Sequence, residues 1–194
     1  AIHKKGGRST SPRTPAFKEL LNKIGDLLLL DYGIDIKWNI QYTIDIGIIG
    51  HGVVGKAISH AFKNPNCHIL VQDPKDENSV ATREMVSMSD IIFVCVPTPM
   101  SSVTGGAIDT RIMDSVMKDL NENRVEHNNP VICIKSTITP DKLDEYKKSY
   151  PELRITMSPE YLTEANPFAD MINMRSLIVG GEPADRKVVI DAFM

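Results

Sequence analysis

The sequence predicts an α/β fold in which helices cover both faces of a doubly wound parallel sheet. From Ile44 onward, short runs rich in β-branched residues alternate with segments of helical spacing. These short runs are apolar throughout instead of alternating with polar residues, which is typical of strands buried on both faces. The composition, 42% hydrophobic and 24% charged residues in a chain of 194, is that of an ordinary globular protein.

The alternation predicts the order of the elements. Six strands are expected, at Ile44–Ile49, His68–Gln72, Ile91–Val96, Val131–Ile134, Arg154–Met157 and Ser176–Val179. Five helices are expected, at Val53–Phe62, Ala81–Met88, Thr110–Asn121, Asp141–Ser149 and Ala184–Phe193. Right-handed crossovers would join these strands into one sheet.

Residues 1–43 form a separate head in this interpretation. They carry a net positive charge and the rest of the chain a net negative charge, which predicts a domain boundary near Ile44. The first ~15 residues are rich in Ser, Pro, Gly, Lys and Arg and are expected to be flexible. A short helix is predicted from Pro15 to Tyr32, and a half-buried strand over Ile34–Ile40. A solvated tail is favoured over a basic arm that binds nucleic acid.

Several classes of protein are excluded by composition. No run approaches the ~20 apolar residues of a membrane span, so no membrane partner is expected. The three cysteines are widely spaced and form no CxxC pair, which excludes a disulfide scaffold and a zinc site and favours the cytoplasm. The net charge of −3 argues against nucleic acid as a partner. No metal site is predicted.

A glycine-rich loop is the first motif that indicates a chemistry. Gly50-His51-Gly52-Val53-Val54-Gly55 closes an apolar strand and opens a helix, as in Rossmann-like dinucleotide-binding domains. Gly50 permits the tight turn, Gly52 lets the backbone approach a pyrophosphate, and Gly55 lets the helix pack closely on the strand. The helix N-terminus, with Val53 and Val54, would offer its N–H groups to the phosphates.

Asp73 strengthens this interpretation. It ends the apolar run that starts at His68 and follows the last glycine at the spacing expected for a ribose-binding carboxylate. A carboxylate there accepts hydrogen bonds from the adenosine ribose and repels a 2′-phosphate, so NAD is predicted over NADP. The alternative is a glycine-rich turn and a surface aspartate in a fold that binds no dinucleotide.

Further motifs follow the next three strands. They are Val96-Pro97-Thr98-Pro99, Ile134-Lys135-Ser136-Thr137-Ile138-Thr139-Pro140 and Ser158-Pro159-Glu160-Tyr161-Leu162-Thr163-Glu164-Ala165. In open α/β sheets, ligands bind at the carboxyl ends of the strands, where these motifs would lie. If the last motif is helical, Glu160 and Glu164 share one face. The alternative for this pair is an exposed acidic helix start.

In their order along the chain, these motifs resemble the UDP-glucose/GDP-mannose dehydrogenase family. The resemblance extends from Ile44 to Met194, includes Ser89-Asp90 and Leu177-Ile178-Val179-Gly180-Gly181, and is to the N-terminal NAD-binding domain of that family. It implies a two-step, four-electron oxidation of a sugar C6 alcohol to a carboxylate. Two NAD molecules and a thioester on a cysteine take part in that reaction.

The resemblance also implies roles for individual residues. Thr98 is similar to a cofactor contact, and Thr137 to a hydroxyl that places NAD and the water or substrate oxygen. Glu160 resembles the carboxylate that serves as acid and base in thioester hydrolysis. The nucleotide-sugar site is completed by three further residues of the same segment, Tyr161, Leu162 and Glu164, of which Glu164 also lies near the nicotinamide.

One part of the family's machinery has no counterpart in the sequence. The nucleophile's Gly-x-Cys-x-x-Lys-Asp stretch and the lysine and asparagine that stabilise the oxyanion are absent. Cys95 and Cys133, predicted to lie inside apolar strands, are expected to be inert. The chain is therefore expected to bind NAD without completing the oxidation, as a portion truncated before the substrate domain.

The complete enzyme is expected to be a homodimer that oxidises UDP-glucose to UDP-glucuronate. Three alternatives are kept. GDP-mannose or a UDP-N-acetyl sugar could be the substrate, or the chain could be a non-catalytic NAD-binding module. The third alternative is another hydroxyacid-type dehydrogenase, against which the Ser158–Glu164 stretch argues.

Overall fold

A computed structural model describes residue 23 and residues 44–100, 105–163 and 165–194. The chain divides into two compact units, Ala1–Ile44 and Asp45–Met194, and the elements below belong to the second, with Ile44 as the first residue of its first strand. The helix from Pro15 and the strand over Ile34–Ile40 lie outside the described residues, Lys23 apart. No helix in the described part of the chain is long and apolar enough to cross a membrane.

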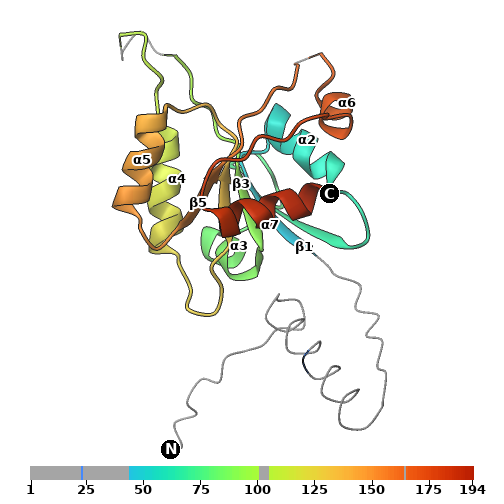
Figure 1. The fold of residues 1–194 in the computed structure, drawn as a ribbon, viewed down its shortest axis with the longest axis horizontal. Coiled ribbons are helices and arrows are strands. Elements are labelled where there is room, and N and C mark those ends of the chain that lie inside the picture. The colour runs from blue at the N-terminus through green and yellow to red at the C-terminus, as the bar shows by residue number, and fades with distance from the viewer. Residues whose placement is uncertain (1–22, 24–43, 101–104, 164) are drawn as a thin grey trace, which may run out of the picture. The chain divides into compact units, whose positions relative to one another are not determined.

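Five strands form one sheet in the order β2-β1-β3-β4-β5 (Figure 1). They are β1 (Ile44–Ile49), β2 (Cys67–Gln72), β3 (Ile91–Val94), β4 (Val131–Ile134) and β5 (Arg154–Met157). β1 pairs in parallel with β3, β3 with β4, and β4 with β5. The winding of the chain reverses between β1 and β3, and α/β sheets bind ligands at such a switch point.

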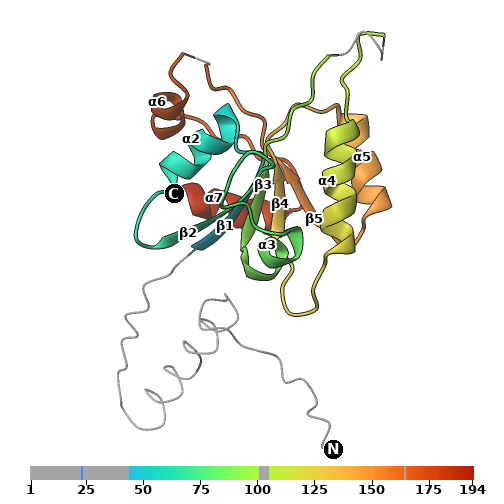
Figure 2. The same ribbon diagram turned by 180° about the vertical axis from the view of Figure 1, so that it is seen from behind.

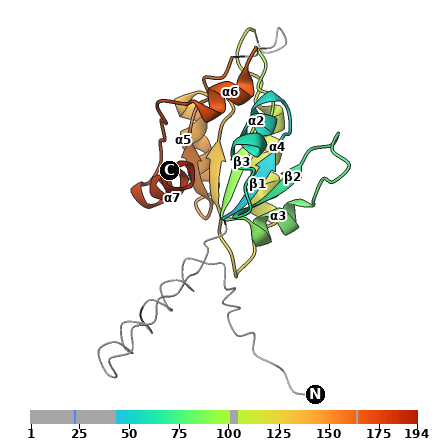
Figure 3. The ribbon, with the colours of Figure 1, turned by 90° about the vertical axis from the view of Figure 1, so that its right-hand side faces the viewer.

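Helices cover both faces of the sheet, as predicted. They are α2 (Val53–Ala61), α3 (Thr82–Met88), α4 (Arg111–Glu122), α5 (Pro140–Ser149), α6 (Pro167–Ile172) and α7 (Pro183–Phe193). Figures 1 and 2 show α4 and α5 side by side across the sheet from α2 and α7, and Figure 3 shows the same elements from the side on which α2 lies. The doubly wound α/β class predicted from the sequence is confirmed.

The alternation of side chains along β3 explains why both faces are covered. Ile92 and Val94 belong to the core cluster that includes Met113 and Met117 of α4. Phe93 points the other way, and its ring lies 5.8 Å from that of Phe193 at the end of α7. Both sets of side chains are buried, so the strand has no polar face.

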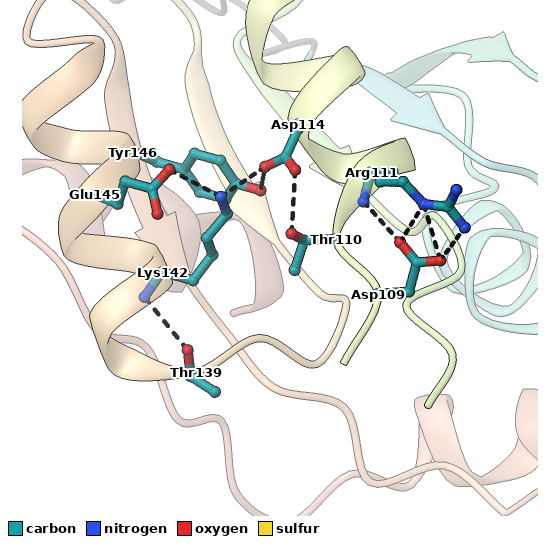
Figure 4. A network of polar contacts seen from close by, with 8 residues as sticks. All are labelled: Asp109, Thr110, Arg111, Asp114, Thr139, Lys142, Glu145 and Tyr146. Carbon is teal, nitrogen blue, oxygen red and sulfur yellow. Dashed lines mark hydrogen bonds and ion pairs between the residues drawn. The ribbon is translucent and has the colours of Figure 1, made fainter. Parts of the chain in front are cut away.

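A polar network fastens α4 to α5 (Figure 4). Asp114 of α4 accepts hydrogen bonds from the Tyr146 hydroxyl at 2.7 Å and from Thr110, and its carboxylate lies 2.9 Å from Lys142 Nζ. Burial alone would raise the pKa of Asp114, but the contacts with Lys142, Tyr146 and Thr110 lower it below its usual value. The network fixes the position of α4, which lines the groove described below.

The predicted elements differ from the structure in three places. Ser176–Val179 is not a strand: next to it, Gly180 forms only an isolated antiparallel bridge with Met157. The glycines at 180 and 181, with φ of 137° at Gly181, and Pro183 leave no room for a regular strand. β3 ends at Val94 instead of Val96, and α6 was missed. The other boundaries agree within one residue.

Candidate functional site

The loops that follow the strands start along one continuous edge. In each case the first residue after a strand donates its N–H to the carbonyl of the last residue of the neighbouring strand: Gly50 to Gln72 at 2.9 Å, Cys95 to Ile49 at 2.7 Å, Lys135 to Val94 at 2.9 Å and Ser158 to Ile134 at 2.9 Å. The four motifs predicted to carry chemistry are therefore brought together at the carboxyl edge of the sheet.

The glycine loop meets the steric demands predicted for it. Gly50 has φ of 90°, and a Cβ there would lie 2.6 Å from the Cys95 carbonyl oxygen. A Cβ on Gly55 would lie 2.1 Å from the Gly50 oxygen, so only glycine allows this approach of α2 to the loop. A Cβ on Gly52 would meet no atom within 4 Å. The space at Gly52 thus remains open to a ligand.

The N-terminus of α2 opens onto the same space. Gly52 is its N-cap, no side chain caps the helix, and its first turn holds no acidic residue. The first N–H groups of a helix have no acceptor within the helix, so those of Val53 and Val54 are offered to a ligand together with the positive end of the helix dipole. A pyrophosphate fits this environment in shape and charge.

Asp73 immediately follows β2 and is held as an anion. Its Oδ1 accepts the Lys75 N–H at 2.8 Å and its Oδ2 accepts the His51 N–H at 2.7 Å. These two hydrogen bonds lower the pKa of Asp73. Each oxygen keeps a lone pair, so the carboxylate can still accept hydroxyl donors such as those of a ribose.

One groove of about 1260 Å³ joins these features. It is lined by the glycine loop, the loop from Asp73 to Asn78, residues 95–97 after β3, and the face of α4 that carries Ile112, Val116 and Asp119. The groove lies over the switch point between β1 and β3. Its position, its open glycine and the uncapped N-terminus of α2 fit the adenosine and pyrophosphate parts of a dinucleotide.

The threonines lie farther along the edge. Thr98 is the fourth residue after β3 and is half-buried, whereas Thr137 is the third residue after β4 and is exposed. Neither residue lines the groove. Their roles stay predictions.

A buried ion pair lies after β4 and β5. Lys135 has a side chain only 1% exposed, and its Nζ lies 2.8 Å from Glu160 Oε2. The same ammonium donates to the Ser158 hydroxyl at 3.2 Å. Lys135 was not among the predicted site residues. The signal available was a lysine placed directly after a fully apolar strand, where burial requires a partner.

The segment around Glu160 is not a helix. Residues 158–163 are extended or irregular, so the shared helical face and the exposed acidic helix start are both wrong. The side chain of Glu160 is instead only 9% exposed, and its Oε1 accepts the Tyr161 N–H. Tyr161 is 70% exposed and Leu162 half-buried. Glu164 lies outside the described residues.

The cysteines have no features of a nucleophile. Cys133 lies inside β4, as predicted, but Cys95 lies one residue beyond β3 and lines the groove. Burial raises the pKa of both thiols, that of Cys133 to about 11, so both stay protonated near neutral pH. Among the residues that the structure describes, no group of three His, Cys, Asp or Glu side chains could hold a metal ion.

Comparison with known proteins gives a family. The family model described as "UDP-glucose/GDP-mannose dehydrogenase family, NAD binding domain" matches residues 77–193, more than half of the chain. A protein of Bacillus subtilis (strain 168) named "Putative UDP-glucose 6-dehydrogenase YtcA" is 30% identical over 102 residues, which are 49% of this chain and 23% of that protein. The family match begins after the glycine loop and Asp73, whose function is therefore argued from the structure.

Solved structures share the fold at low sequence identity. The UDP-glucose dehydrogenase of Pyrobaculum islandicum has a TM-score of 0.69 and 14% identity, with 81% of this chain and 45% of that one covered. The GDP-mannose dehydrogenase of Pseudomonas aeruginosa has a TM-score of 0.63 and 15% identity, and the match covers 76% of this chain and 43% of that one. A 3-hydroxyisobutyrate dehydrogenase of Mycobacterium tuberculosis also matches, with a TM-score of 0.61 and 14% identity over 78% of this chain and 51% of that one.

The fold alone is shared by sugar-nucleotide and hydroxyacid dehydrogenases, whereas the family match distinguishes between them. The chain spans less than half the length of the nucleotide-sugar dehydrogenases named above. The cofactor of the matched domain is NAD, as the groove and Asp73 predict. The chain belongs to the UDP-glucose/GDP-mannose dehydrogenase family, whose NAD-binding domain it carries.

Proposed function

We propose that the chain is the NAD-binding portion of a nucleotide-sugar 6-dehydrogenase that oxidises UDP-glucose to UDP-glucuronate with two NAD. The observation that carries this proposal is the buried Glu160 carboxylate, paired with Lys135 on the same sheet edge as the cofactor groove. A hydroxyl oxidation that ends at a carboxylate needs a base beside the cofactor for its hydrolytic step. The name of the Bacillus subtilis relative supports the choice of UDP-glucose.

The residues of the groove divide the binding of NAD among them. The N–H groups after Gly52 and the N-terminus of α2 would hold the pyrophosphate, and Asp73 would accept the hydroxyls of the adenosine ribose. Thr98 and Thr137, farther along the edge, would place the nicotinamide half. When bound, NAD supplies the hydride acceptor for each of the two oxidations.

Glu160 serves the hydrolytic step in this proposal. Its carboxylate takes a proton from the water that adds to the thioester carbon, and the cysteine thiolate leaves as the carboxylate product forms. Lys135 and the Tyr161 N–H hold the two carboxylate oxygens. Tyr161, Leu162 and Glu164 would line the nucleotide-sugar site, and Thr137 would orient the water.

Each alternative function would need a different part of the site. GDP-mannose or a UDP-N-acetyl sugar would use the same base and cofactor groove with another base- or sugar-binding surface. A non-catalytic NAD-binding module would need the groove but not the Lys135–Glu160 pair. We favour the enzyme because burial of an ion pair is costly and this pair lies at the ligand-binding edge. A homodimer and a cytoplasmic location belong to the same proposal.

Two measurements test the proposal. The 194-residue chain should bind NAD in a calorimetric titration but produce no NADH with UDP-glucose, because the raised pKa values of Cys95 and Cys133 keep both thiols protonated. The product of the complete gene should reduce NAD faster with UDP-glucose than with GDP-mannose or UDP-N-acetylglucosamine. Turnover by the 194 residues alone would contradict the assignment of the nucleophile, and a preference for another sugar would contradict that of the substrate.

A further inference from the structure

His51 connects three elements of the cofactor groove. Its backbone N–H donates to Asp73 Oδ2 at 2.7 Å. Its ring Nδ1 lies 3.0 Å from Asp76 Oδ2, and its Nε2 lies 2.9 Å from the Ser59 hydroxyl of α2. The glycine loop, the loop after β2 and the second turn of α2 are thus joined through one half-buried side chain. We call His51, Ser59 and Asp76 the ribose clamp.

Asp76 is itself fixed within the loop after β2. Its Oδ1 accepts the Asn78 N–H at 3.0 Å, and its own N–H donates to the Asp73 carbonyl at 3.0 Å. Because a carboxylate only accepts, His51 Nδ1 carries the proton of its bond with Asp76, and Nε2 shares a hydrogen bond with the Ser59 hydroxyl. The clamp therefore fixes the backbone that bears Asp73 as well as the Asp73 side chain.

The order of these contacts is also that of a serine-hydrolase relay, but the surroundings do not suit one. Ser59 lies inside α2, where backbone N–H groups are bonded within the helix. No backbone donors are left beside its hydroxyl to stabilise an oxyanion, which such chemistry requires. A positioning role fits the geometry better.

We propose that the ribose clamp positions the Asp73 carboxylate for the adenosine ribose and adds a second barrier to a 2′-phosphate. The inference rests on the proposed placement of that ribose at Asp73. Asp76 lines the groove beside Asp73, so a 2′-phosphate would meet two carboxylates. Asp76 also occupies the His51 ring, which would otherwise be a ready donor to such a phosphate.

Titration calorimetry on the 194-residue chain tests the positioning role. His51→Ala should weaken the binding of NAD and of AMP about tenfold, as expected for the loss of hydrogen bonds to a charged group. His51→Asn keeps a side-chain donor for Asp76 and should recover part of that loss. His127→Ala is the matched control, because His127 is exposed and contacts Ser87 away from the groove. The control should bind NAD like the wild type.

Asp76→Asn tests the electrostatic role. It should lower the ratio of the NADP to the NAD dissociation constant by about fivefold at low salt, and added salt should shrink this effect. A salt-dependent change in this ratio indicates an electrostatic effect on the 2′-phosphate. Damage to the fold alone would weaken both cofactors and leave the ratio unchanged. Melting temperatures of all variants are measured alongside.

Two results would overturn the clamp. Wild-type affinity for NAD in both His51→Ala and Asp76→Asn is the first, and equal losses of NAD and NADP binding in Asp76→Asn at every salt concentration is the second. Asp73→Ala separates this inference from the proposed function. If it loses the preference for NAD while the clamp variants match the wild type, only the clamp is wrong. If it keeps the wild-type preference, the ribose placement fails, and the clamp with it.

Discussion

The two halves of the ligand-binding edge are built in opposite ways. The cofactor half uses backbone N–H groups, glycines and a half-buried carboxylate at Asp73, all within or beside an open groove. The other half uses two side chains, Lys135 and Glu160, that are withdrawn from water and depend on each other. The first half should therefore keep its folding stability when a charge is changed and lose stability when its shape is changed. The second half should lose stability when one charge is removed and should tolerate changes of shape.

The difference has an energetic reason. Burial of an ammonium and a carboxylate costs desolvation energy that their attraction offsets only in good geometry. Loss of one partner leaves a buried charge unpaired, whereas loss of both removes the cost as well. The charged groups Asp73 and Asp76 of the groove are only half-buried, so the loss of a partner there leaves no fully buried charge unpaired. Variants in the two halves can accordingly be compared by stability and by affinity.

The largest effect is expected from Glu160→Gln in the product of the complete gene. The amide keeps the shape and removes the base, so turnover with UDP-glucose should fall by about 10²–10⁴-fold while NAD affinity is retained. Rapid mixing should show a burst of NADH equal to twice the concentration of active sites, because both oxidations precede hydrolysis of the thioester, and then a slow phase. Turnover at the wild-type rate, or loss of the burst, would remove Glu160 from the hydrolytic step.

Lys135→Met tests the mutual dependence in the 194-residue chain. The variant should lose about 3–5 kcal/mol of unfolding free energy, because Glu160 becomes an unpaired buried charge. The double variant Lys135→Met/Glu160→Leu should regain most of that loss. Urea denaturation measures both. A single variant as stable as the wild type would show that the pair is not buried in solution.

Gly55→Ala tests the demand for shape in the cofactor half. The added Cβ would lie 2.1 Å from a backbone oxygen, so the loop or α2 must shift, at a cost of about 3 kcal/mol. The substitution alters no charge and lies outside the buried Lys135–Glu160 pair. Gly105→Ala is a matched control of the same chemistry, because a Cβ there meets no atom within 4 Å, although its φ of 67° adds some strain. Equal denaturation midpoints for the two variants would contradict the close approach of α2.

The smallest effect is expected at Asp114, which fastens α4, the helix that lines the groove, to α5. Its lowered pKa means that the stability from its contacts is present above the usual aspartate value and is lost as pH falls through the folded-state pKa. Asp114→Asn should lower stability at neutral pH by up to about 1 kcal/mol, since the group is partly exposed, and make unfolding less dependent on pH below about 4. Urea midpoints at neutral and acid pH measure both. An unchanged acid dependence would exclude Asp114 as its source.

The same comparison explains what could be predicted from the sequence. The glycine loop and Asp73 are local signals, in which residue type and spacing fix the backbone geometry, and the structure places them as predicted. Lys135 pairs with Glu160 across two strands, and nothing local to either residue identifies the other. The periodicity of Ser176–Val179 suggested a strand, but tertiary pairing through Gly180 overrides it. Contacts between residues far apart in the sequence cannot be predicted from the local sequence pattern.

The measurement that tests the NAD site most directly is a calorimetric titration of Gly52→Ala with NAD. A Cβ on Gly52 meets nothing in the protein, and the backbone there suits alanine, so the stability should change by less than about 1 kcal/mol. The same Cβ occupies the space offered to the pyrophosphate, so NAD binding should weaken at least about tenfold. Normal NAD affinity in a folded Gly52→Ala chain would contradict the placement of the cofactor at this loop.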